Sequence, residues 1–200
     1  MISTRSTILD LARQRGILRS RELDELGLSR TALSRLVESG AILRLSRGLY
    51  TLPNREISEH ATLAEVAMKY PGAIFCLLSA LQLHGVSTQT PHQVWIAIDN
   101  KARAPKMDYP PLKVIRFSGD ALESGVQDMV VDGVVHIPVT NLEKTIADCF
   151  KFRNKIGLDV AIEALQEAWR TKRVTMDGLW NFARICRVSN VMRPYLESLI

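Results

Sequence analysis

Ten arginines and not one lysine stand in the first 55 residues of this 200-residue chain. Five acidic residues leave the segment with a net charge of +5, which equals the formal net charge of the whole chain. A guanidinium group is a planar fork of donors, so it can bind a phosphate or the edge of a guanine through two hydrogen bonds at once. The charge therefore favours a polyanionic partner, with a solvated basic face as the alternative.

The side chains best placed to read DNA lie on a predicted helix at residues 30–39, which Ser29 is expected to cap. Leu33, Leu36 and Val37 recur at helical spacing and predict the buried stripe of this helix. Its polar residues cluster in the N-terminal half, where a recognition helix contacts base edges in the major groove. The candidate DNA-binding residues are Ser29, Arg30, Thr31, Ser34 and Arg35.

The stretch LSRGLYTLP supplies more arginines directly after that helix. Residues 42–45 and 49–52 predict two strands that meet at Ser46-Arg47-Gly48, where glycine gives the backbone freedom that a hairpin turn requires. A hairpin in this place is typical of the wing of a winged helix, close to phosphates or the minor groove. The candidate DNA-binding residues of the hairpin are Arg44, Ser46 and Arg47. The residues expected to keep it packed are Leu45, Leu49 and Tyr50.

Two earlier helices would position the predicted recognition helix and the hairpin that follows it. The segment STRSTILDLARQRG predicts a first helix that ends at Gly16, and Ser20 is expected to cap a second helix, RELDELG, with Leu23 and Leu26 facing inward. A turn at Gly27-Leu28 joins the second helix to the third, which is the pattern of a helix-turn-helix. We therefore predict a winged helix-turn-helix DNA-binding domain at residues 1–55.

The same segment, SRELDELGLSRTALSRLVESGAILRLSRGLYTLP, resembles the N-terminal domain of the AbiEi family of bacterial antitoxins. The resemblance continues in YPGAIFCLLSALQLHGVSTQTPHQVWIAI and in VTNLEKTIADCFKFRNKIGLDVAIEAL. It implies a repressor and antitoxin of a type IV, abortive-infection toxin–antitoxin system that acts in phage defence. The winged helix would bind double-stranded DNA at inverted repeats in the module's own promoter. The second domain would counteract a nucleotidyltransferase-type toxin, with or without touching it.

Residues 56–200 predict that second domain, and the fold class of the whole chain is α/β (α+β). A small mixed sheet is expected, and Asp132-Gly133 is a strong hairpin signal. Thr140-Asn141-Leu142-Glu143 has the pattern of a capping box that begins a helix through Cys149. The predicted strands are 94–98, 112–117, 126–131 and 134–137, and the other predicted helices are 59–70, 77–85, 158–171, 175–186 and 189–199.

Catalytic interpretations of this domain are weaker. Asp99-Asn100-Lys101 has the D-x-K form of metal-dependent nucleases, but no partner acid is evident on a neighbouring strand, which leaves Glu65 on a predicted helix as the remaining candidate. Ser79 and His84 stand five positions apart on one short helix, which is poor geometry for a nucleophile and its base. The four histidines lack ligand spacing, and no phosphate-binding loop is present. We expect no catalytic residue, no metal and no cofactor.

Two alternatives stay open beside the antitoxin: a winged-helix regulator whose C-terminal domain senses a ligand, and a metal-dependent nuclease. Ten basic residues after position 140 are a possible positive face for a nucleic acid or an acidic protein. The longest apolar run, residues 73–78, is far shorter than a membrane span, and the start MISTRSTILD has no signal-peptide core. Three scattered cysteines suit reduced, buried thiols. We expect a cytoplasmic protein with no membrane contact.

Overall fold

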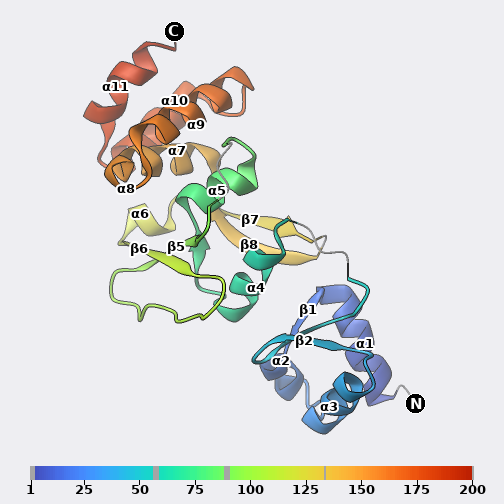
Figure 1. The fold of residues 1–200 in the computed structure, drawn as a ribbon. Coiled ribbons are helices and arrows are strands. Elements are labelled where there is room, and N and C mark those ends of the chain that lie inside the picture. The colour runs from blue at the N-terminus through green and yellow to red at the C-terminus, as the bar shows by residue number, and fades with distance from the viewer. Residues whose placement is uncertain (1–2, 56–58, 88–90, 133, 200) are drawn as a thin grey trace. The chain divides into compact units, whose positions relative to one another are not determined.

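Helices and two sheets make up the computed structural model, which confirms the predicted mixed α/β class (Figure 1). The structure describes residues 3–55, 59–87, 91–132 and 134–199. Contacts divide the chain into an N-terminal unit, Met1–Pro71 with Met129–Ile137, and a C-terminal unit, Gly72–Asp128 with Pro138–Ile200. These units differ from the predicted domain limits of 1–55 and 56–200, because the chain after residue 58 and the residues at 129–137 pack with the first segment. The assignment of DNA binding to residues 1–55 and of antitoxin action to residues 56–200 stays a prediction.

The N-terminal unit alternates helices with the strands of an antiparallel sheet. Its three strands lie in the order β1-β3-β2, so β3 is central and β2 is an edge strand. The elements are α1 (Thr4–Arg15), β1 (Ile17–Arg19), α2 (Ser20–Glu25), α3 (Arg30–Glu38), β2 (Leu43–Ser46), β3 (Leu49–Thr51) and α4 (Ala61–Lys69).

Helix α1 ends at Gly16 as predicted, and the backbone there requires glycine. Gly16 has a φ of 69°, which side chains disfavour, and a Cβ atom at this position would lie 2.5 Å from the Cγ2 atom of Val134. Strand β1 follows at once and was not predicted, because three residues between a glycine and a helix are too few to show strand alternation. Its Ile17 and Leu18 are completely buried.

A small apolar core holds helices α1, α2 and α3 and the sheet of this unit together. The buried members of its central cluster are Ile8, Ala12, Leu18, Leu23, Leu33, Leu36 and Ile42. Leu26 was predicted to face inward and is 53% exposed, because α2 ends at Glu25 and Leu26 no longer continues the buried face. Leu45 was expected to pack the hairpin and is exposed, because it lies on the edge strand β2. Leu49 is buried, whereas Tyr50 and Val37 are half-buried against the core.

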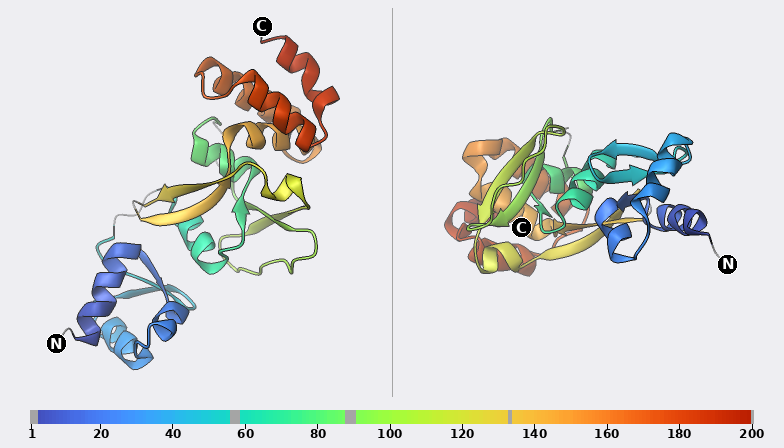
Figure 2. Two further views of the ribbon diagram at one scale, coloured as in Figure 1. Left: turned by 180° about the vertical axis from the view of Figure 1, so that it is seen from behind. Right: turned by 90° about the horizontal axis from the view of Figure 1, so that it is seen from below.

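The C-terminal unit combines most of a five-stranded sheet with a group of helices (Figure 2). The strand order β6-β5-β4-β8-β7 is mixed as predicted, since β5 pairs parallel with β6, and β4 pairs antiparallel with β5 and parallel with β8. Gly133 of the predicted hairpin lies outside the described residues. The elements are β4 (Ile74–Phe75), α5 (Leu77–His84), β5 (Val94–Asp99), β6 (Leu112–Phe117), α6 (Asp120–Glu123), β7 (Val126–Val131), β8 (Val135–Thr140), α7 (Leu142–Lys151), α8 (Arg153–Ile156), α9 (Leu158–Arg170), α10 (Met176–Ile185) and α11 (Ser189–Glu197).

Helix α7 is central to the C-terminal unit, because it contacts α5, α9, α10 and α11. Its N-cap is Asn141, whose side-chain oxygen accepts a hydrogen bond of 2.9 Å from the backbone N–H of Lys144. The capping box predicted a threonine cap one residue earlier. Instead, the hydroxyl of Thr145 donates to the carbonyl of Asn141 at 2.7 Å and lies 2.7 Å from the hydroxyl of Thr140. The short elements β4, α6 and α8 were not predicted, since two to four residues show no periodicity.

Candidate functional site

The predicted reading helix α3 forms where the sequence places it, and its buried and polar faces separate as expected. Leu33 and Leu36 are buried, and the candidate residues at its N-terminal half are exposed. Ser29 occupies the N-cap position, but its side chain makes no capping hydrogen bond, so the predicted cap is wrong in this respect. Its backbone carbonyl instead accepts from Ala32 and Leu33 at 3.1 and 3.3 Å. Ser20 likewise is the first residue of α2 rather than its cap.

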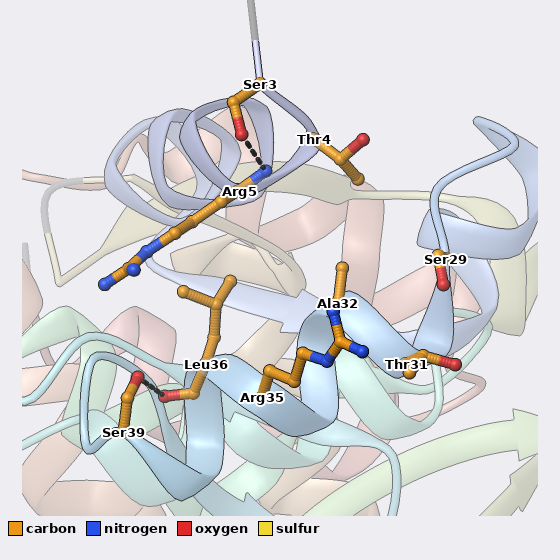
Figure 3. Close-up of a pocket in the computed structure, with 9 residues that line it drawn as sticks. All are labelled: Ser3, Thr4, Arg5, Ser29, Thr31, Ala32, Arg35, Leu36 and Ser39. Atoms are coloured by element: carbon orange, nitrogen blue, oxygen red, sulfur yellow. Dashed lines mark hydrogen bonds between the residues drawn. The ribbon is translucent and has the colours of Figure 1, made fainter.

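The exposed residues of α3 form two parallel rows, because positions four apart share one face of a helix. Thr31 and Arg35 form one row, and Arg30 and Ser34 form the other. The first row borders a groove of about 580 Å³ between α3 and the start of α1 (Figure 3). The groove is lined by Ser3, Thr4, Arg5, Ser29, Thr31, Ala32, Arg35, Leu36 and Ser39.

This groove has the chemistry of an anion-binding surface. Arg5 extends into it from α1 and Arg35 from α3, and none of its lining residues is acidic (Figure 3). Neither arginine forms an ion pair within the part of the chain that the structure describes. The other polar lining groups are hydroxyls; that of Ser39 already donates to the carbonyl of Leu36, and the rest can donate to phosphate oxygens. Arg5 was not among the predicted residues, because only the fold brings α1 beside α3.

The second row of α3 contains an arginine that is already bound. Arg30 donates from Nε to Oδ1 of Asp24 at 2.8 Å and from Nη2 to Oδ2 at 2.5 Å. The side chain of Arg30 is 71% exposed and that of Asp24 is 37% exposed. The hydrogen bonds from Arg30 lower the pKa of Asp24, and the same bonds raise the pKa of Arg30. Both groups therefore stay ionised across the physiological range.

The hairpin after α3 presents its arginines at the surface. Arg44 on β2 and Arg47 in the turn are exposed, and Nε of Arg44 donates to the carbonyl of Ser46 at 3.4 Å. The hydroxyl oxygen of Ser46 is buried and has no hydrogen-bond partner within the described chain. Gly48, with a φ of 82°, closes the turn, and its carbonyl accepts from the backbone N–H of Ser20 at 2.9 Å. That bond fixes the hairpin tip to the start of α2.

The side chains considered for catalysis in the C-terminal unit make hydrogen bonds to the backbone. Oδ1 of Asp99 accepts from the backbone N–H of Lys101 at 2.7 Å, which is the hydrogen bond of a local turn. The hydroxyl of Ser79 accepts from the N–H of Trp95 at 2.9 Å, and Nε2 of His84 lies 2.8 Å from the carbonyl oxygen of Thr140. Burial lowers the pKa of His84, which favours the neutral ring.

Metal sites and membrane-spanning helices are both missing from the described residues. Among them, no three histidine, cysteine, aspartate or glutamate side chains gather closely enough to hold a metal ion. The same residues include no helix that is both long and apolar enough to cross a membrane. All three cysteines are buried free thiols, as predicted.

Comparison with known proteins supports the resemblance seen in the sequence. Residues 6–53 match the profile of a family described as transcriptional regulator, AbiEi antitoxin. This match runs from within α1 to just after β3 and includes every predicted DNA-binding residue, whereas Arg5 lies directly before it. No curated protein matches the chain.

Solved structures that match include one that is similar over the whole chain. It is the RV2827C protein from Mycobacterium tuberculosis, with a TM-score of 0.61 and 16% sequence identity. The similarity covers 100% of this chain and 81% of that one. At this identity the likeness shows a shared fold.

Proposed function

We propose that this protein is a DNA-binding transcriptional repressor and the antitoxin of a toxin–antitoxin module. The AbiEi match at residues 6–53 suggests a regulator of this kind, and the surface of α3 supports DNA as its ligand. Helices α2 and α3 would be the helix-turn-helix, and the β2–β3 hairpin would be the wing. Residues 1–55 would then be the DNA-binding domain of a protein that acts in the cytoplasm.

The observation that carries this proposal is the arrangement of cations around α3. Arg35 and Arg5 border one groove without an acidic neighbour, and Arg44 and Arg47 are exposed on the hairpin that follows. In the proposed complex, Thr31, Ser34 and Arg35 read base edges while Ser29 and the hairpin arginines contact the backbone, and Ser46, whose hydroxyl is buried, makes no side-chain contact with DNA. Phosphate contacts would fix the register of α3, and base contacts would supply the sequence preference.

The family match suggests what the rest of the chain does. We propose that residues 56–200 counteract a nucleotidyltransferase-type toxin, and that the first domain represses the module's promoter at inverted repeats. Because members of this family are regulators, we propose no catalytic residue and no cofactor.

The experiment is a binding titration with the DNA upstream of the protein's own gene, beside a scrambled duplex of equal length. We expect preferential binding to the upstream DNA, with a footprint over an inverted repeat, and repression of a reporter driven by that DNA. Equal affinity for both duplexes would contradict the proposed repressor. Co-expression with the toxin encoded beside the gene tests the second activity, and growth should recover only when the protein is present.

A cavity of about 480 Å³ in the C-terminal unit favours a ligand-sensing regulator as the second candidate. It is lined by Gly85, Val86, Ser87, Glu163, Gln166, Glu167 and Arg170. Its volume is in the range of small-molecule sites. However, most of its lining residues are of polar or charged types, and Arg170 already pairs with Glu167 at 2.7 Å. A ligand that changes operator affinity, in a protein that gives no protection against a toxin, would favour this candidate.

A further inference from the structure

Arg30 differs from the other candidate readers because a second helix holds it in place. Asp24 belongs to α2, and its two carboxylate oxygens accept from two different nitrogens of the Arg30 guanidinium. Arg30 is the first residue of α3, where a recognition helix comes closest to the bases. A role for Arg30 in base recognition rests on the proposed DNA binding.

The geometry of this pair leaves one defined edge of the guanidinium open. A guanidinium carries five N–H donors, one on Nε and two on each Nη atom. Asp24 takes the edge formed by Nε and Nη2, so the edge formed by Nη1 and Nη2 keeps its donors. Within the described chain Nη1 of Arg30 donates no hydrogen bond, and the side chain is 71% exposed. Two parallel donors are therefore presented in a fixed orientation.

The charge of the pair decides which DNA group suits that edge. The carboxylate of Asp24 is ionised and lies against the guanidinium, so it offsets the attraction of Arg30 for a phosphate and repels the phosphate itself. A guanine edge is neutral, and its O6 and N7 atoms accept two hydrogen bonds from one arginine. Because Asp24 already restricts the side chain, less rotamer freedom is lost when the base binds.

We propose that Asp24 is a positioning residue that fixes Arg30, so that the free end of the guanidinium reads a guanine in the major groove. Arg30 is then a specificity-determining residue, and Asp24 acts through it without contacting the base. Arg35, which has no such partner in the described chain, serves a different base or the backbone.

The experiment selects bound DNA from a library of duplexes with a randomised central segment, using the full-length protein. Sequencing the bound fraction gives the base preference at each position for wild type, Arg30→Ala, Arg30→Lys and Asp24→Asn. The matched control is Asp10→Asn, because Asp10 is also an exposed acid that binds an arginine, Arg13, at 2.6 Å on α1. Thermal melting shows that each variant is folded.

We expect one guanine of the selected motif to disappear in Arg30→Ala, and the same guanine to weaken in Asp24→Asn. Arg30→Lys should also lose it, since lysine keeps the charge without the fork. The wild-type preference for that guanine should be on the order of 10- to 100-fold. Asp24→Asn should bind the unselected library as tightly as wild type or more tightly, because a negative charge is removed from the DNA-facing surface.

Three results separate failure of this inference from failure of the proposed function. If wild type selects a motif and Asp24→Asn selects the same motif at full strength, the positioning role of Asp24 is wrong. If Asp24→Asn and Arg30→Ala lose different positions, Asp24 does not act through Arg30. If wild type selects no motif at all, sequence-specific DNA binding fails, and the inference fails with it.

Discussion

The two compact units differ in where their most prominent charged groups lie, although each contains an ion pair with little exposure: Arg55 with Asp132 in the N-terminal unit, and Lys144 with Asp148 in the C-terminal unit. In the N-terminal unit the arginines of α1, α3 and the hairpin are exposed, around a small apolar core. In the C-terminal unit Lys144 and Asp148 are almost completely buried in the larger core. Charges left on a surface are available to a partner, whereas a buried pair serves the fold itself.

The buried pair extends into a network with defined partners. Nζ of Lys144 donates to Oδ2 of Asp148 and lies 4.7 Å from the centre of the Phe117 ring. Sγ of Cys186 donates to Oδ1 of Asp148 at 3.3 Å. Burial, with the neighbouring carboxylate, raises the pKa of the Cys186 thiol to about 12, and burial also raises the pKa of Asp148. The Cys186 thiol is therefore held protonated as a hydrogen-bond donor to Asp148, and it is not available as a nucleophile.

The largest effect is expected from breaking this pair. Lys144→Met keeps the aliphatic part of the side chain and leaves a buried carboxylate without its cation, which should lower the free energy of unfolding by about 3–5 kcal/mol. Differential scanning calorimetry of the full chain measures the loss. The double variant Lys144→Met with Asp148→Leu should recover most of it, because an apolar pair replaces the ionic one. DNA affinity should be unchanged at temperatures where both proteins are folded, and a parallel loss of affinity would contradict the division of roles between the units.

The second-largest effect is expected from Arg35, on the exposed face of α3 that is proposed to contact the bases. Replacing Arg35 by alanine should weaken operator binding by about 1–3 kcal/mol and relax the base preference at one operator position. A titration on the operator and its single-base variants measures both quantities. Ser39→Ala is a suitable control, since Ser39 lines the same groove and its hydroxyl donates to the carbonyl of Leu36 at 3.1 Å. Unchanged affinity and preference would remove Arg35 from the base-reading set.

The same contrast explains how much of the molecule the sequence could predict. The periodicity of Leu33 and Leu36 predicts α3, and Gly48 marks the hairpin turn, because both signals are local. Strand β1 was missed because only its pairing with β3 makes it a strand. Arg5 and the bond from Arg30 to Asp24 were missed for a related reason, since each depends on how one helix packs against another. The sequence could therefore predict which residues are exposed on α3 and the hairpin, but it could not predict which residues from other helices lie beside them.

A smaller effect is expected at the hairpin. Changing Arg44 and Arg47 to alanine should weaken specific and nonspecific binding by similar factors, because phosphates are alike beside every base. The slope of log affinity against log salt should become shallower by roughly 2, from about 0.9 for each lost contact. The matched control is Arg13→Ala with Arg21→Ala, which removes the same charge from arginines that pair with Asp10 and Glu25. An equal change in the control would assign the effect to net charge, and parallel slopes would show that the hairpin does not touch the backbone.

The smallest effect is expected from Arg5, which separates the backbone and base contacts of the groove. Arg5 reaches the groove from α1, whereas Arg35 reaches it from the reading helix (Figure 3). If Arg5 binds one phosphate, Arg5→Ala should make the salt slope shallower by about 0.9 and leave every base preference as it is. The control is Arg13→Ala, which removes an arginine from the same helix that already pairs with Asp10. A salt titration on operator and scrambled duplexes measures the slopes, with melting curves to show that α1 is intact. A changed base preference would make Arg5 a reader, and the groove would then belong to the base-recognition surface as a whole. An unchanged slope would leave Arg35 as the groove's contact with DNA and limit the cationic surface to α3 and the hairpin.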